Sequence, residues 1–345
     1  MGGKAVTLVR GVVTSMDVLV ADTLEPEVLN WLAARHALSC EPELARQPEA
    51  FRKALTQARA VVIPASVPID AAALKKAPQL RAIARASGSS DNLDMAACAA
   101  AGVEVVRPTA AGMVAEAEFA IGALLQMLRR VPVISPEGLL VGRELNGATV
   151  GIIGMTPTAR PLAELLRAFG ARVMGYDPGL HASDALWARW NITPIGLREL
   201  VEQCDAVVVL LAYFSRYRGL LGERYLGECR QDQVMVNLSN ALIFDEAALA
   251  EALTSGRMAA AWLDNVDPAL TASGRPLAHI DSLQVTPRVA STTRESHLRA
   301  SWAIARRLDE LLSQSGPARR EPPPLSVRPA PPTSRADLSG GPMPG

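Results

Sequence analysis

The sequence lacks the features that mark metal-binding, secreted or membrane proteins. Its four cysteines stand far apart, with no CxxC pair and no histidine at metal-ligand spacing, so we expect neither a metal site nor a disulfide framework. No run of about 18 apolar residues occurs, and the first residues lack the apolar stretch and cleavage site of a secretory signal. We therefore expect a cytoplasmic protein without a membrane partner, whose cysteines are small buried hydrophobic residues.

An excess of charge of one sign is also lacking. Lys and Arg number 35 and Asp and Glu number 35, so the formal net charge is +0. No overall field attracts nucleic acid, which is not an expected partner, and any ligand must be recognised locally. The four histidines, His36, His181, His279 and His297, are isolated in the sequence. We expect them to be structural or solvent-exposed.

What the sequence does contain is a repeated α/β pattern over a length that predicts two cores. From Met16, short apolar runs alternate with amphipathic segments, a pattern typical of a parallel sheet covered by helices. This first series reads MDVLVAD, PEVLNWLAARH, ARAVVIPAS and APQLRAIARA, with a further strand expected over 100–106. The second series reads TVGIIG, RVMGYDP, AVVVLLA, QVMVNLS, RMAAAWLDN and LQVTP. Long helices are predicted over 112–130 and 293–313.

The last segment, 315–345, has a different composition. Repeated prolines remove amide donors, and few large apolar groups remain to bury, which predicts a disordered Pro-rich tail. The alternative is a polyproline II ligand for a partner's groove.

A candidate dinucleotide site lies in VGIIGMTPTARPLAELL, where a buried strand passes directly into a helix. The N-terminus of such a helix offers free amides and a positive dipole end to a pyrophosphate. The positions of the usual GxGxxG pattern hold Gly154, Thr156 and Ala159. Thr156 or Thr158 is expected to cap the helix or donate to phosphate, and Pro157 suits its first turn.

Asp177 ends the next strand, about 20 residues after the glycine turn, where an acidic side chain can accept hydrogen bonds from the adenosine ribose. This placement favours NAD over NADP. The alternative interpretation is an Asp-Pro turn with a purely structural role.

Several segments, in their order along the chain, resemble the D-isomer-specific 2-hydroxyacid dehydrogenases. They are ARASGSSDNLDMAACAAAGVEVV, GRELNGATVGIIG, RAFGARVMGYDP, VMVNLSNALIFDEAALAEALTSGRMAAAWLDN and LQVTPRVAS. The resemblance implies two Rossmann-like doubly wound domains: a flavodoxin-like substrate domain over 16–108 and 289–314, and an inserted NAD-binding domain over 109–288. A ligand would lie between them, and the family also implies a homodimer.

The same resemblance identifies the positions of the family's catalytic arginine, histidine and glutamate. Asn240 stands in place of the arginine that clamps the substrate carboxylate, and Arg288 in place of the histidine that exchanges the proton. The glutamate position falls on Ala269 without a gap, or on Asp267 with a short deletion. The family counterpart of Asp264 touches the nicotinamide carboxamide.

The loop that would meet the substrate is also altered, because Ser87, Gly88 and Ser89 replace its glycine-rich pattern. Its backbone amides are still expected to bind an anion. The connection from Pro132 to Gly142 is shorter than in the family, where this region extends the dimer.

These observations leave two functions open. The first is a relative that binds NAD and a small acidic metabolite, in which Asn240 and Arg288 form an altered anion site without ordinary 2-hydroxyacid turnover. The alternative is an NAD-dependent oxidoreductase on a 2-hydroxy or 2-keto acid that uses a non-standard mechanism.

Overall fold

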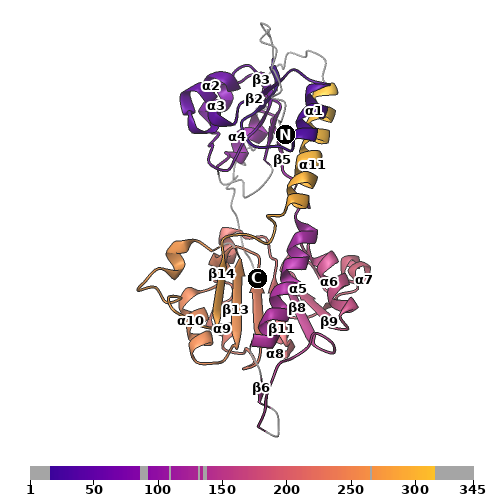
Figure 1. The fold of residues 1–345 in the computed structure, drawn as a ribbon, viewed down its shortest axis with the longest axis vertical. Helices are drawn as coiled ribbons and strands as arrows, with labels where there is room; N and C mark the ends of the chain where they lie inside the picture. The colour runs from indigo at the N-terminus through magenta and orange to yellow at the C-terminus, as the bar shows by residue number, and fades with distance from the viewer. Residues whose placement is uncertain are drawn as a thin grey trace, which may run out of the picture.

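The fold consists of two parallel sheets, each enclosed by helices on both faces (Figure 1). The structure is a computed structural model that describes residues 16–85, 92–108, 110–130, 133–134, 138–264 and 266–314. Buried β-branched strands alternate with amphipathic helices, as expected for parallel sheets covered on both sides. The predicted α/β fold class with two doubly wound sheets is confirmed.

The first sheet has the strand order β2-β1-β3-β4-β5, and all its pairs are parallel. Its strands are β1 (Met16–Val20), β2 (Leu38–Cys40), β3 (Ala58–Val62), β4 (Ala82–Ala84) and β5 (Glu104–Val106). The helices around it are α1 (Pro26–Ala33), η1 (Pro42–Arg46), α2 (Pro48–Leu55), α3 (Ala71–Lys76), α4 (Met95–Ala100) and α11 (Arg294–Ser313).

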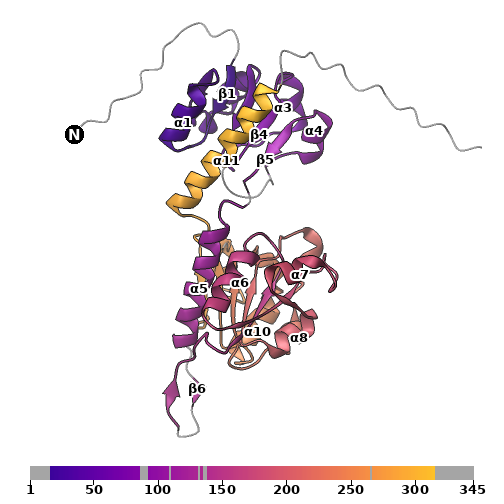
Figure 2. The same ribbon diagram turned by 90° about the vertical axis from the view of Figure 1, so that its right-hand side faces the viewer.

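Helix α11 comes from the end of the chain but packs on this first sheet, beside α1 (Figures 1 and 2). Ile304, Ala305 and Leu308 of α11 are 0% exposed and belong to the same core as the strand residues Val18 and Val20. Thr293 caps the helix by accepting a hydrogen bond from the Ser296 amide. The apolar face of α11 therefore fixes its place against sheet residues almost 300 positions earlier.

The second sheet has the order β10-β9-β8-β11-β12-β13-β14, again entirely parallel. Its strands are β8 (Thr149–Ile153), β9 (Arg172–Tyr176), β10 (Thr193–Pro194), β11 (Ala206–Val209), β12 (Val234–Asn237), β13 (Ala260–Asp264) and β14 (Leu283–Thr286). The chain order reverses beside β8, which is the position where open α/β sheets bind ligands at the carboxyl ends of their strands.

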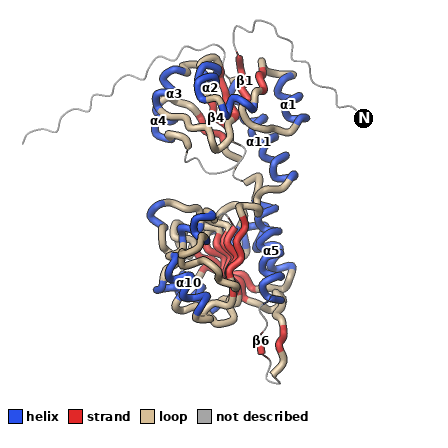
Figure 3. Tube along the Cα trace, turned by 60° about the vertical axis from the view of Figure 1, so that its left-hand side comes forward, coloured by secondary structure: helices blue, strands red, loops and turns tan. Residues whose placement is uncertain are grey.

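Helices cover the two faces of this sheet in two groups, seen on either side of the strands in Figure 3. One face carries α5 (Met113–Arg130), α6 (Ala159–Ala168) and α7 (Ala185–Trp190). The other carries α8 (Leu197–Gln203), α9 (Glu223–Leu226) and α10 (Glu246–Thr254). Short 3-10 turns η2 (Ser215–Tyr217), η3 (Ala241–Ile243) and η4 (Pro268–Thr271) lie in the loops.

Two connections join the sheets and pass close to each other. A Cβ atom placed on Gly112 would lie 3.0 Å from the Cβ of Ser291, so glycine allows this approach. The Arg299 side chain of α11 also donates a hydrogen bond of 2.9 Å to the Ala111 carbonyl. The predicted domain limits at residues 108 and 288 nevertheless stay predictions.

The secondary structure agrees with most of the predicted segments. All six strand segments of the second series contain a strand, and the two long helices occur as α5 and α11. The strand expected over 100–106 is wrong in its first half, because Ala100 ends α4 and Gly102, at φ +61°, turns the chain before β5. The amphipathic segment APQLRAIARA contains strand β4, since Ala82, Ile83 and Ala84 are all buried in the sheet.

A two-stranded hairpin of β6 (Val133–Ile134) and β7 (Leu140–Val141) projects from the end of α5 (Figure 2). The segment 315–345, for which a disordered tail was predicted, lies outside the described residues. No helix in the described part of the chain is long and apolar enough to cross a membrane.

Candidate dinucleotide site and family catalytic positions

Gly154 forms the sharp turn that follows β8. Its φ is +101°, and a Cβ atom at this position would lie 2.4 Å from the backbone of Leu211. Its amide donates to the Tyr176 carbonyl at 2.7 Å. Both the backbone angle and the close approach of β11 exclude a side chain here, which gives the first glycine of the predicted turn a clear physical cause.

Asp177 follows β9 and holds this turn in place. One carboxylate oxygen accepts the Met155 amide at 2.8 Å, and the other accepts the Gly179 amide at 2.8 Å. The structural interpretation of Asp177 as a turn former agrees with the contact to Gly179. A carboxylate has about four lone-pair positions, so acceptor capacity remains for a ribose hydroxyl.

Thr158 precedes α6 but does not cap it, which corrects one expectation. Its side chain is buried, and its hydroxyl donates to the Glu116 carboxylate of α5 at 2.5 Å. Position 158 has helical backbone angles, and no side-chain cap is present. Glu116 was not among the predicted site residues, and its only signal is an acidic side chain in the first turn of α5.

The other residues of the turn differ in exposure. Thr156 is half-buried, and its carbonyl accepts the Ala159 amide at 2.9 Å, while Ala159 is fully buried where α6 packs against the sheet. Pro157 is exposed and lies before α6 rather than in its first turn. The helix starts at Ala159, as expected from Pro161.

Asp264 ends β13 and is almost completely buried. Its carboxylate accepts three hydrogen bonds, from the Thr286 hydroxyl at 2.7 Å, the Val289 amide at 2.8 Å and the Ala290 amide at 2.9 Å. The Trp262 indole also donates to the Thr286 hydroxyl. In the described structure Asp264 therefore links the segment between β14 and α11 to the end of β13.

Asn240, which was expected at the position of the family arginine, caps the turn η3. Its side-chain oxygen accepts the Leu242 amide at 2.9 Å. The preceding Asn237 and Ser239 are buried and hydrogen-bonded to each other and to the Leu211 carbonyl. Local hydrogen bonds thus hold the turn that follows β12.

Arg288 and the two glutamate candidates all lie exposed on loops. Arg288 has a left-handed backbone, at φ +58°, and its side chain makes no ion pair within the described residues. Asp267 accepts the Ala269 amide at 2.9 Å and thus caps η4. No hydrogen bond or ion pair connects the side chains of Asn240, Asp267 and Arg288 in the described structure.

The remaining candidates add no acid or base. Ser87, Gly88 and Ser89 lie outside the described residues. His36 has a structural position, because its side chain is only 8% exposed and contacts Asp309 of α11 at 2.8 Å. Within the described ranges, no three His, Cys, Asp or Glu side chains gather as metal ligands would. Burial raises the pKa of Cys204 and Cys229 to about 12, so both thiols remain protonated at neutral pH.

Comparison with known proteins gives the family. Residues 123–290 match the family model described as D-isomer specific 2-hydroxyacid dehydrogenase, NAD binding domain. The chain is 30% identical over 253 residues to an (S)-sulfolactate dehydrogenase of Chromohalobacter salexigens, which covers 71% of this chain and 81% of that relative. It is 30% identical over 298 residues to a D-3-phosphoglycerate dehydrogenase of Mycobacterium tuberculosis, covering 84% of this chain but only 55% of the relative.

A solved structure shows the same fold. The crystal structure of a glyoxylate reductase from Paecilomyes thermophila superposes with a TM-score of 0.72 at 21% identity, covering 87% of this chain and 96% of the other. The chain belongs to the D-isomer-specific 2-hydroxyacid dehydrogenase family, and its second sheet forms the family's NAD-binding domain.

The residues of the second sheet fit NAD unequally. The Gly154 turn, the start of α6 and the spare acceptor capacity of Asp177 fit the adenosine side of a dinucleotide. The pyrophosphate position is less favourable, because Pro157 has no amide donor and the Glu116 carboxylate lies beside Thr158.

Proposed function

We propose that this protein binds NAD through its second sheet but does not oxidise 2-hydroxy acids by the acid–base route of its family. It would act instead as a binding relative that recognises the nucleotide or an acidic metabolite. The observation that carries this proposal is that the residues expected at the family's catalytic positions form no titratable acid–base pair in the described structure. Asn240 and Asp267 cap their own turns, and Arg288 cannot titrate near neutral pH.

The geometry supports the proposal because the family's proton exchange needs a titratable side chain held by a carboxylate. Arg288 is a fixed cation on an exposed loop, and neither Asp267 nor Ala269 contacts it in the described structure. An arginine fork in this place suits a carboxylate or phosphate ligand. Binding without turnover therefore accounts for the residues at all three positions.

The cofactor is tested first, by titrating the purified protein with NADH and NADPH and following the nicotinamide fluorescence. We expect NADH to bind more tightly, since the Asp177 carboxylate repels a 2′-phosphate. Asp177→Ala should weaken NADH binding, while Asp184→Ala, which removes an exposed helix cap of α7, serves as the control. Equal affinity of the two cofactors for the unaltered protein would contradict the assignment of Asp177.

Turnover is tested with NADH and a series of 2-keto acids. We expect no appreciable NADH oxidation by the unaltered protein. The triple variant Asn240→Arg, Ala269→Glu and Arg288→His should gain measurable activity if only the side chains are missing. Robust turnover by the unaltered protein that is abolished by Arg288→Ala would instead establish the alternative, an oxidoreductase with a non-standard mechanism.

A further inference from the structure

A cavity of about 230 Å³ lies in the NAD-binding domain, away from the Gly154 turn. It is enclosed by the turn η3, the start of α10, the end of β13 and the loop that follows β13. Strands β11 and β12 separate β13 from β8 and its turn. None of the candidate dinucleotide residues lines this cavity, neither those of the Gly154 turn nor Asp177 and Asp264.

The floor of this cavity is apolar. It is formed by side chains from four separate segments, namely Leu242, Phe244, Leu249, Leu263, Leu270 and Leu277. Four of these six are 6% exposed or less, so the floor belongs to the packed core and its shape is fixed. An engineered apolar cavity of about 150 Å³ takes up benzene, so this cavity can hold a benzene-sized body with a short substituent.

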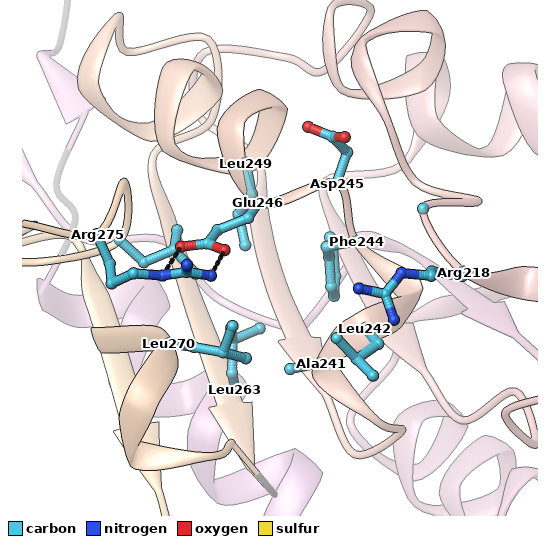
Figure 4. A pocket seen from close by; sticks show the side chains of 12 residues that line it. Arg218, Ala241, Leu242, Phe244, Asp245, Glu246, Leu249, Leu263, Leu270 and Arg275 are labelled. Atoms are coloured by element: carbon cyan, nitrogen blue, oxygen red, sulfur yellow. Dashed lines mark hydrogen bonds and ion pairs between the residues drawn. The ribbon is translucent and has the colours of Figure 1, made fainter. Parts of the chain in front are cut away.

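The rim carries charge on two opposite sides of the floor (Figure 4). On one side the Arg275 guanidinium pairs with Glu246, with nitrogen–oxygen distances of 2.5 and 3.2 Å. On the other side stands Arg218, whose exposed guanidinium has no ion-pair partner in the part of the chain that the structure describes.

The acidic side chains of the rim balance the two arginines overall, but neither of them pairs with Arg218 in the described structure. Glu246 is paired with Arg275, and Asp245 accepts the Ala248 amide as the cap of α10. A phosphate dianion would meet these two carboxylates, whereas a single carboxylate can pair with Arg218 alone. An apolar floor beside a cation that has no ion-pair partner among the described residues favours an amphipathic monoanion.

We propose that this cavity is a binding site for a monocarboxylic acid with a compact apolar body, such as an aryl or branched aliphatic acid. The apolar body fills the leucine-lined floor, and the carboxylate accepts hydrogen bonds from Arg218. This site lies within one domain and needs no residue of the catalytic positions, so it does not depend on the proposed function. Its occupant would contact Ala241 and Leu242, in the turn that Asn240 caps.

The experiment measures binding of phenylacetate and of its neutral analogue phenylacetamide to the full-length protein by titration calorimetry. We expect submillimolar binding of the acid, and weaker binding of the amide by about tenfold or more, because a charge-assisted hydrogen bond is lost. Arg218→Gln should produce the same loss for phenylacetate. Leu270→Phe, which reduces the cavity volume, should weaken the acid and the amide alike.

Arg216→Gln is the matched control. Arg216 lies two residues away in the same loop and stacks on Phe214 and Tyr217, with its guanidinium 4.9 and 4.7 Å from the ring centres, but it does not line the cavity. Its removal should leave phenylacetate binding unchanged. Three results would overturn the proposal: no binding at millimolar concentration, equal affinity of acid and amide, or competition between phenylacetate and NADH for one site.

Discussion

At the scale of single residues, several polar side chains at the predicted site positions hydrogen-bond to nearby backbone and stabilise the local fold. Asn240, Asp264 and Asp267 each accept backbone amides of neighbouring turns. Asp177 does the same on the dinucleotide side. A side-chain oxygen that accepts backbone amides in this way stabilises the loop around it, and its removal leaves those donors without acceptors.

Gly154→Ala is the sharpest test at this scale. The added methyl group meets the Leu211 backbone at 2.4 Å and forces a left-handed angle on a non-glycine residue. We expect a loss of at least about 2 kcal/mol in the free energy of unfolding, together with weaker NADH binding. Chemical denaturation measures the first effect. Gly256→Ala, at φ +75° with open space around it, isolates the cost of the angle.

The individual residues were the least predictable part of the sequence. The spacing indicated Gly154 and Asp177, because a strand, a turn and a helix in that order need a glycine and permit an acid. It could not indicate that Thr158 faces Glu116, since that contact depends on how α5 lies across α6. Nor could it indicate Arg218 and its cavity, whose walls come from four separate segments.

At the scale of elements, an ion pair joins two neighbouring inner strands of the first sheet. Arg59 of β3 donates to Asp17 of β1 at 2.7 Å and also to the Leu312 carbonyl at the end of α11. Burial alone would raise the pKa of the Asp17 carboxyl, but the hydrogen bonds from Arg59 and the Ala37 amide hold the pKa below its ordinary value of 3.8. One carboxylate thus joins a strand, a neighbouring strand and a loop.

This lowered pKa makes a prediction about acid stability. Because the folded pKa of Asp17 lies below the unfolded one, its contribution is present above the unfolded pKa and is lost as the pH falls through the folded pKa. Asp17→Asn should therefore lower the free energy of unfolding by about 1–2 kcal/mol at neutral pH. The difference from the unaltered protein should vanish in strong acid. Urea unfolding across this pH range measures the difference. The control is Glu49→Gln, which breaks the exposed ion pair between Glu49 and Arg52.

Elements were largely predictable because their signals are local. Strands such as TVGIIG and AVVVLLA are continuous apolar runs, as strands buried on both faces should be. The short strands of the first sheet were harder. β4 is only three residues long, and its neighbours give the segment an amphipathic pattern, so only the pairing with β3 and β5 identifies it.

At the scale of the whole molecule, the two sheets have separate cores. One pair of core clusters surrounds the first sheet and includes α11, and the other pair surrounds the second. Trp31 and Trp302 pack edge to face in the first, with ring centres 5.7 Å apart. Proteins with separate cores commonly unfold in more than one step.

We therefore expect two unfolding transitions. NADH should raise the midpoint temperature of only the transition that belongs to the second sheet. Leu308→Ala removes a fully buried side chain of α11. It should lower the free energy of unfolding of the first sheet alone, by about 2–5 kcal/mol. Calorimetry with and without NADH measures both effects. A single transition that both the ligand and the substitution shift would show instead that the cores unfold together.

The contacts around Asp264 also have a mechanical consequence. Asp264 holds the Val289 and Ala290 amides, the Thr292 hydroxyl and amide donate to the carbonyls of Arg288 and Val289, and Thr293 then caps α11. The chain from β14 to α11 thus has hydrogen bonds at nearly every step. A rotation of one sheet against the other that bends this connection would have to break some of these hydrogen bonds, so the buried Asp264 carboxylate couples the end of β13 to the start of α11.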